Sequence, residues 1–215
     1  GFRGKFMKWI QMMYNEDKAP QRRIYVNGFY SDWFNIKSGV AQGCPISPLL
    51  FLVVAEALRN SLLMEPRLKG IKINDTVHLI SQFADDTTLM LGHQKEIKYV
   101  DRALKRWCKA TGMRENTTKR EGVKMGKYRY QNINSPGIKW ANDGEFVICL
   151  GVPIGNDLNT EKWWHHKVAA TRDKTSHWAG LYRNSYFGRN LIVQGMYFGR
   201  LRYWLYTIPM SKDMI

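Results

Sequence analysis

The spacing of apolar positions predicts helices at both ends of the chain and short strands between them. At the start, helical spacing predicts an amphipathic helix that Pro20 closes; its apolar positions are Phe6, Trp9, Ile10, Met13 and Tyr14. Residues 24–26 and 29–36 have strand composition, and the Asn27-Gly28 pair between them is the strongest short signal for a hairpin turn. Residues 146–154 predict a second hairpin, a strand, a tight turn and a strand.

Two longer helices are predicted in the middle of the chain. The first runs from Leu49 to about Met64, with Ser47 as its N-cap and Pro48 as its first helical residue. It is apolar nearly all round at its start, which predicts burial. The second helix ends at Gly112, a natural C-cap, and carries the apolar stripe Ile97, Val100, Leu104 and Trp107. Lys and Arg occupy its other faces, which is more often a solvated surface than a contact surface.

From Thr160 onward the pattern is helical again, and aromatic residues alternate with basic ones. This combination suits a helical subdomain that stacks aromatic rings on nucleic acid, although the same rings can equally form its core. The residues are Trp163, Trp164, Lys167, Arg172, Trp178, Tyr182, Arg183, Arg189, Tyr197, Arg200, Arg202, Tyr203 and Trp204.

Two adjacent carboxylates, Asp85 and Asp86, interrupt an apolar stretch. Residues 77–84 and 87–91 are predicted strands, so the pair falls at the tip of a hairpin, where Asp tolerates the turn backbone. Neighbouring like charges repel and apolar surroundings penalise both, and a bound cation removes both costs. Mg²⁺ typically takes one or two carboxylates and completes its shell with water and substrate phosphate. The alternative is a solvated acidic turn.

A glycine-containing segment at residues 39–48 leads directly into the first of the long helices. It joins a mobile backbone to a rigid support, which suits a place where a ligand approaches the main chain. An ordinary loop and helix start is the alternative.

Composition narrows the class of protein. The 215 residues are 44% hydrophobic and 13% aromatic, which excludes a disordered chain. The three cysteines are far apart and odd in number, so they fit neither a disulfide framework nor a zinc site and indicate a reducing compartment. No apolar run is long enough to span a membrane.

The net charge of +15 is unevenly distributed. Residues 1–92 hold 11 Lys and Arg against 8 Asp and Glu, whereas residues 93–215 hold 22 against 10. A basic half beside an acidic tip suggests a polyanion held against a metal site. Charge alone is equally compatible with a ribosomal or membrane-surface protein.

The motifs, taken in order, resemble the reverse transcriptase of non-LTR (LINE-type) retrotransposons, with group II intron and retron enzymes as more distant relatives. Residues 39–51 read GVAQGCPISPLLF and match that family's Q-G-x-P-x-S-P-x-L-F motif; residues 83–86 read FADD and match its [YF]-A-D-D box. Residues 112–119, GMRENTTK, are similar to its G-[LM]-x-x-N-x-x-K element. Leu150-Gly151 resembles the primer-grip hairpin, and residues 188–192 with Tyr203 and Ile208-Pro209 resemble the thumb.

The resemblance implies an α+β fold: a right-hand polymerase palm, an antiparallel sheet with packed helices, over residues 1–157, and a mostly helical thumb over residues 158–215. It implies that Asp85 and Asp86 bind catalytic Mg²⁺, two ions in the complete enzyme, with Mn²⁺ as an alternative. Lys119 would lie near the pyrophosphate and protonate it, unless it is simply a surface lysine. By the same resemblance, Gln42, Gly43, Pro45 and Ser47 contact the incoming nucleotide and template, and Leu150 and Gly151 form the primer grip. The partners would be an RNA template, a DNA primer and dNTPs.

Departures from the family pattern shape the expected activity. The span contains no D-x-x-x-A-[FY]-D strand, which carries a further metal-binding aspartate in the family, and no fingers; Arg120 stands where Ser or Thr is usual. We therefore expect a palm-and-thumb fragment that is inactive alone, from an enzyme of the nucleus or a cytoplasmic ribonucleoprotein. A non-catalytic RNA-binding remnant and an intron-encoded maturase are the alternatives.

Overall fold

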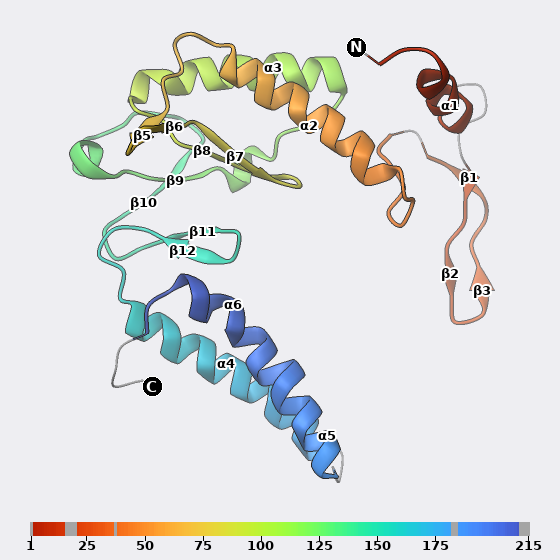
Figure 1. Cartoon of the computed structure of the whole chain (residues 1–215), viewed down its shortest axis with the longest axis vertical. Coiled ribbons are helices and arrows are strands. Elements are labelled where there is room, and N and C mark those ends of the chain that lie inside the picture. Colours follow the sequence, from red (N-terminus) through yellow and green to blue (C-terminus); the bar gives the residue numbers. More distant parts are fainter. Residues whose placement is uncertain (1, 16–20, 37, 182–184, 211–215) are drawn as a thin grey trace. The chain divides into compact units, whose positions relative to one another are not determined.

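The computed structural model describes residues 2–15, 21–36, 38–181 and 185–210, and its mixture of helices and strands confirms the α+β class (Figure 1). The helices are α1 (Lys5–Met13), α2 (Ser47–Leu63), α3 (Ile97–Thr111), α4 (Thr160–Leu181), α5 (Tyr186–Leu191) and α6 (Gly199–Thr207). The strands are β1 (Gln21–Arg22), β2 (Tyr25–Val26), β3 (Phe29–Tyr30), β4 (Phe34–Asn35), β5 (Ile71–Ile73), β6 (Thr76–His78), β7 (Ile80–Phe83), β8 (Asp86–Leu89), β9 (Glu121–Val123), β10 (Lys139–Ala141), β11 (Val147–Cys149) and β12 (Val152–Ile154). A π-helical segment, Ile192–Phe198, joins α5 to α6.

Among the described residues each strand pairs with only one other strand, so they do not form the predicted antiparallel sheet as one continuous sheet. Five of these pairs are antiparallel, and β9 with β10 is parallel. Each strand is two to four residues long, and four of the antiparallel pairs close through their own two-residue turns. Strand pairing is therefore mostly local, and helices contact two of the hairpins: α2 and α3 contact β7–β8, and α6 contacts β11–β12.

The chain divides into two compact units, Gly1–Ala57 and Leu58–Ile215, and the division falls inside α2. In the first unit, α1 ends at Met13, where the N–H of Tyr14 donates to the carbonyl of Ile10. The helix thus stops before Pro20, which lies outside the described residues. The predicted hairpin at Asn27-Gly28 is confirmed: these turn residues have φ angles of 51° and 89°, as a type I′ turn requires.

The core of the second unit lies between two helices and the β7–β8 hairpin. The C-terminal half of α2 supplies Leu58 and Leu62, α3 supplies Val100 and Ala103, and the other buried members are Leu68 and Leu79. Ile80 and Leu89 of the hairpin pack against this cluster. The predicted α3 stripe is confirmed, and Gly112 ends the helix in the left-handed conformation, its N–H donating to the carbonyl of Cys108.

Two expectations about the start of α2 are wrong. Leu49 and Leu52 are 60% and 59% exposed, because the buried core cluster of the described structure takes its α2 members, Leu58 and Leu62, from the second half of the helix. The helix also begins one residue earlier than predicted. The carbonyl of Ile46 accepts the first helical hydrogen bond, from the N–H of Leu50, so Ile46 takes the cap position and Ser47 is helical.

A second core forms between α4 and α6. Its buried members are Trp163, Trp164, Leu201 and Ile208, and the indole of Trp164 donates to the carbonyl of Pro209 at 3.2 Å. The ring of Trp163 packs edge-on against those of Trp164 and Trp204. These tryptophans are therefore core residues; Tyr182 and Arg183, predicted with them, lie outside the described residues. No helix in the described part of the chain has the length and apolarity of a membrane span.

Candidate active site

The adjacent aspartates lie at the tip of the β7–β8 hairpin, as predicted. Phe83 pairs with Asp86, so Ala84 and Asp85 form a two-residue turn and Asp86 opens β8. Ala84 has a φ of 51°, a left-handed conformation that L residues adopt only at an energetic cost. The predicted strand over residues 77–84 is wrong in one respect: it breaks at Leu79 into β6, which pairs with β5, and β7.

Successive side chains of a strand point to opposite faces, so the two faces of the β7–β8 hairpin carry different residues. Ile80 and Leu89 are paired partners on one face, and this face packs on α2 and α3. Phe83 and Asp86 are paired partners on the other face, where both are exposed. Asp86 therefore projects from the side of the hairpin that no helix of this core covers, and Asp85 adjoins it at the tip.

A second hairpin, β11–β12, reaches this open face. Thr88 lies two residues beyond Asp86, hence on the same face, and its Oγ1 lies 3.2 Å from the Sγ of Cys149 in β11. The two turns, Ala84-Asp85 and Leu150-Gly151, thus belong to hairpins that touch through side chains 61 residues apart in sequence. The structure brings the predicted primer-grip turn and the predicted metal-binding turn into one neighbourhood.

Helix α6 holds the turn of the second hairpin. Leu150 and Gly151 have φ angles of 49° and 82°, so this tight turn is also a primed one. The hydroxyl of Tyr203 donates to the carbonyl of Leu150, and the indole of Trp204 donates to that of Gly151 at 3.0 Å. Sequence reasoning grouped Tyr203 and Trp204 only with the helical region and missed these contacts, which join residues 53 positions apart.

Lys119 ends a 3₁₀ turn, Thr117–Lys119, and is exposed. In the described structure no hydrogen bond or ion pair joins it to the aspartates. Its neighbour Arg120 anchors the segment: its guanidinium lies 2.8 Å from Asp101 of α3 and also pairs with Glu115. The hydrogen bonds that Arg120 donates to Glu115, followed by its interaction with Asp101, raise the pKa of Arg120. Sequence reasoning noted Arg120 as a departure from the Ser or Thr pattern and did not foresee this bridge.

The remaining predicted residues lie in the first unit. Gln42, Gly43 and Pro45 are exposed in the segment before α2, where Gln42 and Gly43 form a turn and Gly43 has a φ of 86°. Ser47, by contrast, is 6% exposed. The idea that these residues share a surface with Asp85 and Asp86, which belong to the second unit, stays a prediction.

The donor chemistry of the aspartate pair suits a hard divalent cation. Within the described residues, His, Cys, Asp and Glu nowhere gather in a group of three or more that could hold a metal. Two adjacent exposed carboxylates at a hairpin tip nonetheless fit Mg²⁺, which takes one or two carboxylates from the protein and leaves its other positions to water and phosphate. Asp85 and Asp86 are therefore the residues that would hold it.

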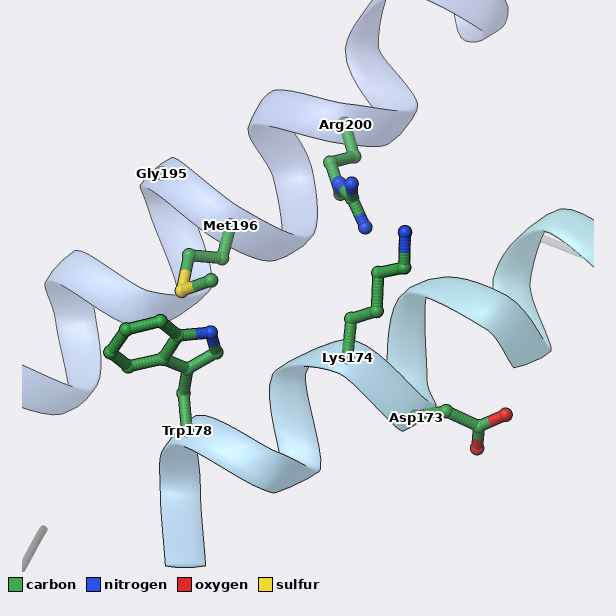
Figure 2. Close-up of a pocket in the computed structure, with 6 residues that line it drawn as sticks. All are labelled: Asp173, Lys174, Trp178, Gly195, Met196 and Arg200. Atoms are coloured by element: carbon green, nitrogen blue, oxygen red, sulfur yellow. The ribbon is translucent and has the colours of Figure 1, made fainter. Parts of the chain in front are cut away.

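A basic groove lies between α4 and the π-helical segment (Figure 2). It encloses about 550 Å³ and is lined by Asp173, Lys174, Trp178, Gly195, Met196 and Arg200. Figure 2 shows Lys174 and Arg200 pointing toward one another from opposite sides, while the carboxylate of Asp173 points away. Two facing cations with an aromatic ring nearby form a surface suited to a phosphate backbone.

The chain matches a known protein family. The model of the reverse transcriptase (RNA-dependent DNA polymerase) family matches residues 2–155. The matched range includes both hairpins of the candidate site, the segment before α2 and Lys119. It ends just before α4, the helix that lines the basic groove.

Proposed function

Because the chain belongs to the reverse transcriptase family, we propose that it is the palm and thumb of an RNA-directed DNA polymerase of the non-LTR retrotransposon type. The palm spans residues 1–157 and the thumb residues 158–215. Its partners are an RNA template, a DNA primer and dNTPs. The non-LTR assignment rests on the motif at residues 39–51 and on the order in which the other motifs follow it.

The observation that carries the proposal is the two-sided β7–β8 hairpin. One face is fixed to α2 and α3 by Ile80 and Leu89, and the other presents Asp86 beside the β11–β12 hairpin. A rigid support behind exposed carboxylates is what phosphoryl transfer needs, because this chemistry depends on positioning and charge neutralisation more than on reactive side chains.

Each element of the chain has a distinct role in this account. Bound at Asp85 and Asp86, Mg²⁺ supplies activation of the primer 3′-hydroxyl and neutralisation of phosphate charge, with Mn²⁺ as a substitute. The Leu150-Gly151 turn, held by α6, orients the primer end. Lys119 offers a cation and a proton to the leaving pyrophosphate. Gln42, Gly43, Pro45 and Ser47 contact the incoming nucleotide and template, and the groove between α4 and the π-helical segment holds the duplex backbone.

Primer extension by an extended chain tests this proposal. Residues 1–215 hold no D-x-x-x-A-[FY]-D segment, so the test uses a chain extended by a segment that supplies that carboxylate. We expect the extended chain to copy RNA into DNA with Mg²⁺. Asp85→Asn should abolish extension and leave template–primer binding nearly intact, because the carboxylate charge organises the metal whereas affinity comes from distant Lys and Arg contacts.

Asp75→Asn is the matched control. Asp75 lies in the turn of the neighbouring β5–β6 hairpin, fully exposed and paired with Lys72. This control should extend primers at the parent rate. Parent-rate extension by Asp85→Asn would contradict the metal assignment. An extended chain that binds template–primer without ever extending it would favour the alternative of a non-catalytic RNA-binding remnant.

A further inference from the structure

Helix α3 carries a row of cations on its outer side. Lys98, Arg102, Lys105 and Lys109 follow one another at spacings of four, three and four residues, and all are exposed. Such spacing places them on one helix face. Arg106 lies beside them, also exposed. We call these five residues the α3 basic stripe; it extends over about 16 Å at 1.5 Å per residue.

The stripe lies on the opposite side of the molecule's second unit from the candidate active site. Val100, Ala103 and Trp107 of α3 face the core, and the stripe occupies the other side of the helix. The β7–β8 hairpin packs on that core through Ile80 and Leu89 and points Asp86 away from it. The stripe and the aspartates are thus separated by at least the diameter of a helix, about 10 Å.

No salt bridge compensates the charges of the stripe in the described part of the chain. In the part that the structure describes, none of the five side chains forms an ion pair. Asp101, the acidic residue of α3, is bound to Arg120 at 2.8 Å. Like charges four residues apart on a helix cost a few tenths of a kcal/mol each, and a bound polyanion would remove this cost.

The ring of Tyr99 contacts several cationic side chains at one end of the stripe. The ring of Tyr99 lies 4.9 Å from the Nζ of Lys98, 5.8 Å from the guanidinium of Arg102 and 4.3 Å from that of Arg67. Arg67 is itself fixed by a two-pronged pairing with the buried carboxylate of Glu65, at 2.6 and 3.2 Å. These contacts limit the rotamers of Lys98 and Arg102, so less side-chain entropy is lost when they bind an anion.

We infer that the α3 basic stripe is a second nucleic-acid site, which binds the phosphate backbone of a helical RNA segment outside the template–primer. A shallow groove of about 440 Å³ runs along it, lined by Lys98, Asp101, Arg102, Lys105 and Arg106. Every lining side chain is charged, and no aromatic or aliphatic anchor of the kind that dominates protein interfaces lines it. A linear row of cations instead fits an A-form helix, which proteins read through backbone and shape.

Binding of a fluorescent RNA hairpin to the whole chain tests the inference. The stripe variant is Lys98→Gln/Lys105→Gln/Lys109→Gln, which preserves helix propensity because Gln and Lys are nearly equal in helices. The control variant, Lys72→Gln/Lys127→Gln/Lys139→Gln, removes the same charge from other exposed positions. We expect the stripe variant to bind at least about tenfold more weakly at low salt, with a salt slope reduced by roughly 2 to 3, and the control to change little.

A lysine acetylation footprint locates the contact independently of activity. The hairpin should protect Lys98, Lys105 and Lys109 both with and without saturating template–primer. The footprint rests on the proposed function in one respect only, the assignment of template–primer to the opposite face. If the polymerase proposal fails, protection of these lysines in the absence of template–primer still tests the stripe.

Three results would overturn the inference. Equal affinity of the stripe and control variants for the hairpin would remove the stripe from the contact. Tighter binding of a DNA hairpin than of the RNA hairpin would contradict the assignment to RNA. If a polyglutamate peptide with the same charge as the RNA hairpin protected the stripe lysines more strongly than the hairpin does, the partner would be an acidic protein instead.

Discussion

Ala84 and Leu150 have positive φ angles, 51° and 49°, and each stands in the two-residue turn of a candidate-site hairpin. For a residue with a side chain this conformation costs roughly 1–2 kcal/mol. Such strain persists where the surrounding structure imposes it and is concentrated at functional sites. At Leu150 the carbonyl is held by the hydroxyl of Tyr203. At Ala84 the pairing of Phe83 with Asp86 fixes the turn.

The strain at Ala84 leads to a stability prediction. Ala84→Gly should raise the free energy of unfolding by roughly 0.5–1 kcal/mol, because relief of the left-handed strain exceeds the added entropy of the unfolded chain. Chemical denaturation measures it. Ala169→Gly, in the interior of α4, should lower stability by about 1 kcal/mol. Equal losses in both variants would show that the turn at Ala84 is not left-handed.

At the scale of elements, the β11–β12 hairpin and α6 behave as one assembly. Val152 of the hairpin packs on the tryptophan core, and Tyr203 and Trp204 bond to the two turn carbonyls. Ring and hydrogen-bond contacts together fix the turn against the helix. The position of the Leu150-Gly151 turn is therefore coupled to the packing of α6.

Tyr203→Phe tests this coupling. Loss of the hydroxyl should lower the free energy of unfolding by about 1 kcal/mol, because it leaves the Leu150 carbonyl with one fewer donor. Tyr206→Phe is the matched control: Tyr206 lies in the same helix and is 86% exposed. Hydrogen exchange should show faster opening near residues 149–152 in Tyr203→Phe alone. Identical exchange in the two variants would contradict the coupling.

Elements with local signals were predictable from the sequence. The turn at Asn27-Gly28, the cap at Gly112, the aspartate hairpin and the turn at Leu150-Gly151 all follow from residues within a few positions. The break at Leu79 did not follow; it lies beside a close approach between residues distant in sequence, where a Cβ on Gly70 would lie 2.5 Å from the carbonyl oxygen of His78. Packing between residues distant in sequence does not appear in the periodicity of apolar positions along the chain.

Across the whole molecule, positively charged side chains gather on two separate surfaces, the groove between Lys174 and Arg200 and the α3 basic stripe. Lys174 and Arg200 come from different helical segments and meet across one groove, whereas the α3 basic stripe lies on a single helix. The sequence predicted a basic C-terminal half and the basic outer faces of the helix that ends at Gly112, but not the groove that Lys174 and Arg200 line. Composition does not encode tertiary contacts. These contacts place Lys174 and Arg200 on the same groove and join Arg120 to Asp101.

The groove lined by Lys174 and Arg200 should dominate template–primer binding. Lys174→Gln/Arg200→Gln should reduce the slope of log affinity against log salt by roughly 2, because each lost phosphate contact contributes about 0.9. Lys162→Gln/Arg202→Gln removes the same charge from exposed positions of α4 and α6 and should leave the slope nearly unchanged. Titration of a labelled RNA–DNA hybrid at several salt concentrations gives both slopes. Equal slopes would remove the groove from the contact.

Paramagnetic broadening by Mn²⁺ measures directly, in the whole chain, whether Asp85 and Asp86 bind the divalent cation of nucleotidyl transfer. We expect Mn²⁺ to broaden the backbone amide signals of residues 83–87 first, and excess Mg²⁺ to restore them. Asp85→Asn/Asp86→Asn should abolish the broadening, and Asp75→Asn should preserve it. Broadening that spares residues 83–87, or that survives the double Asn variant, would contradict the claim.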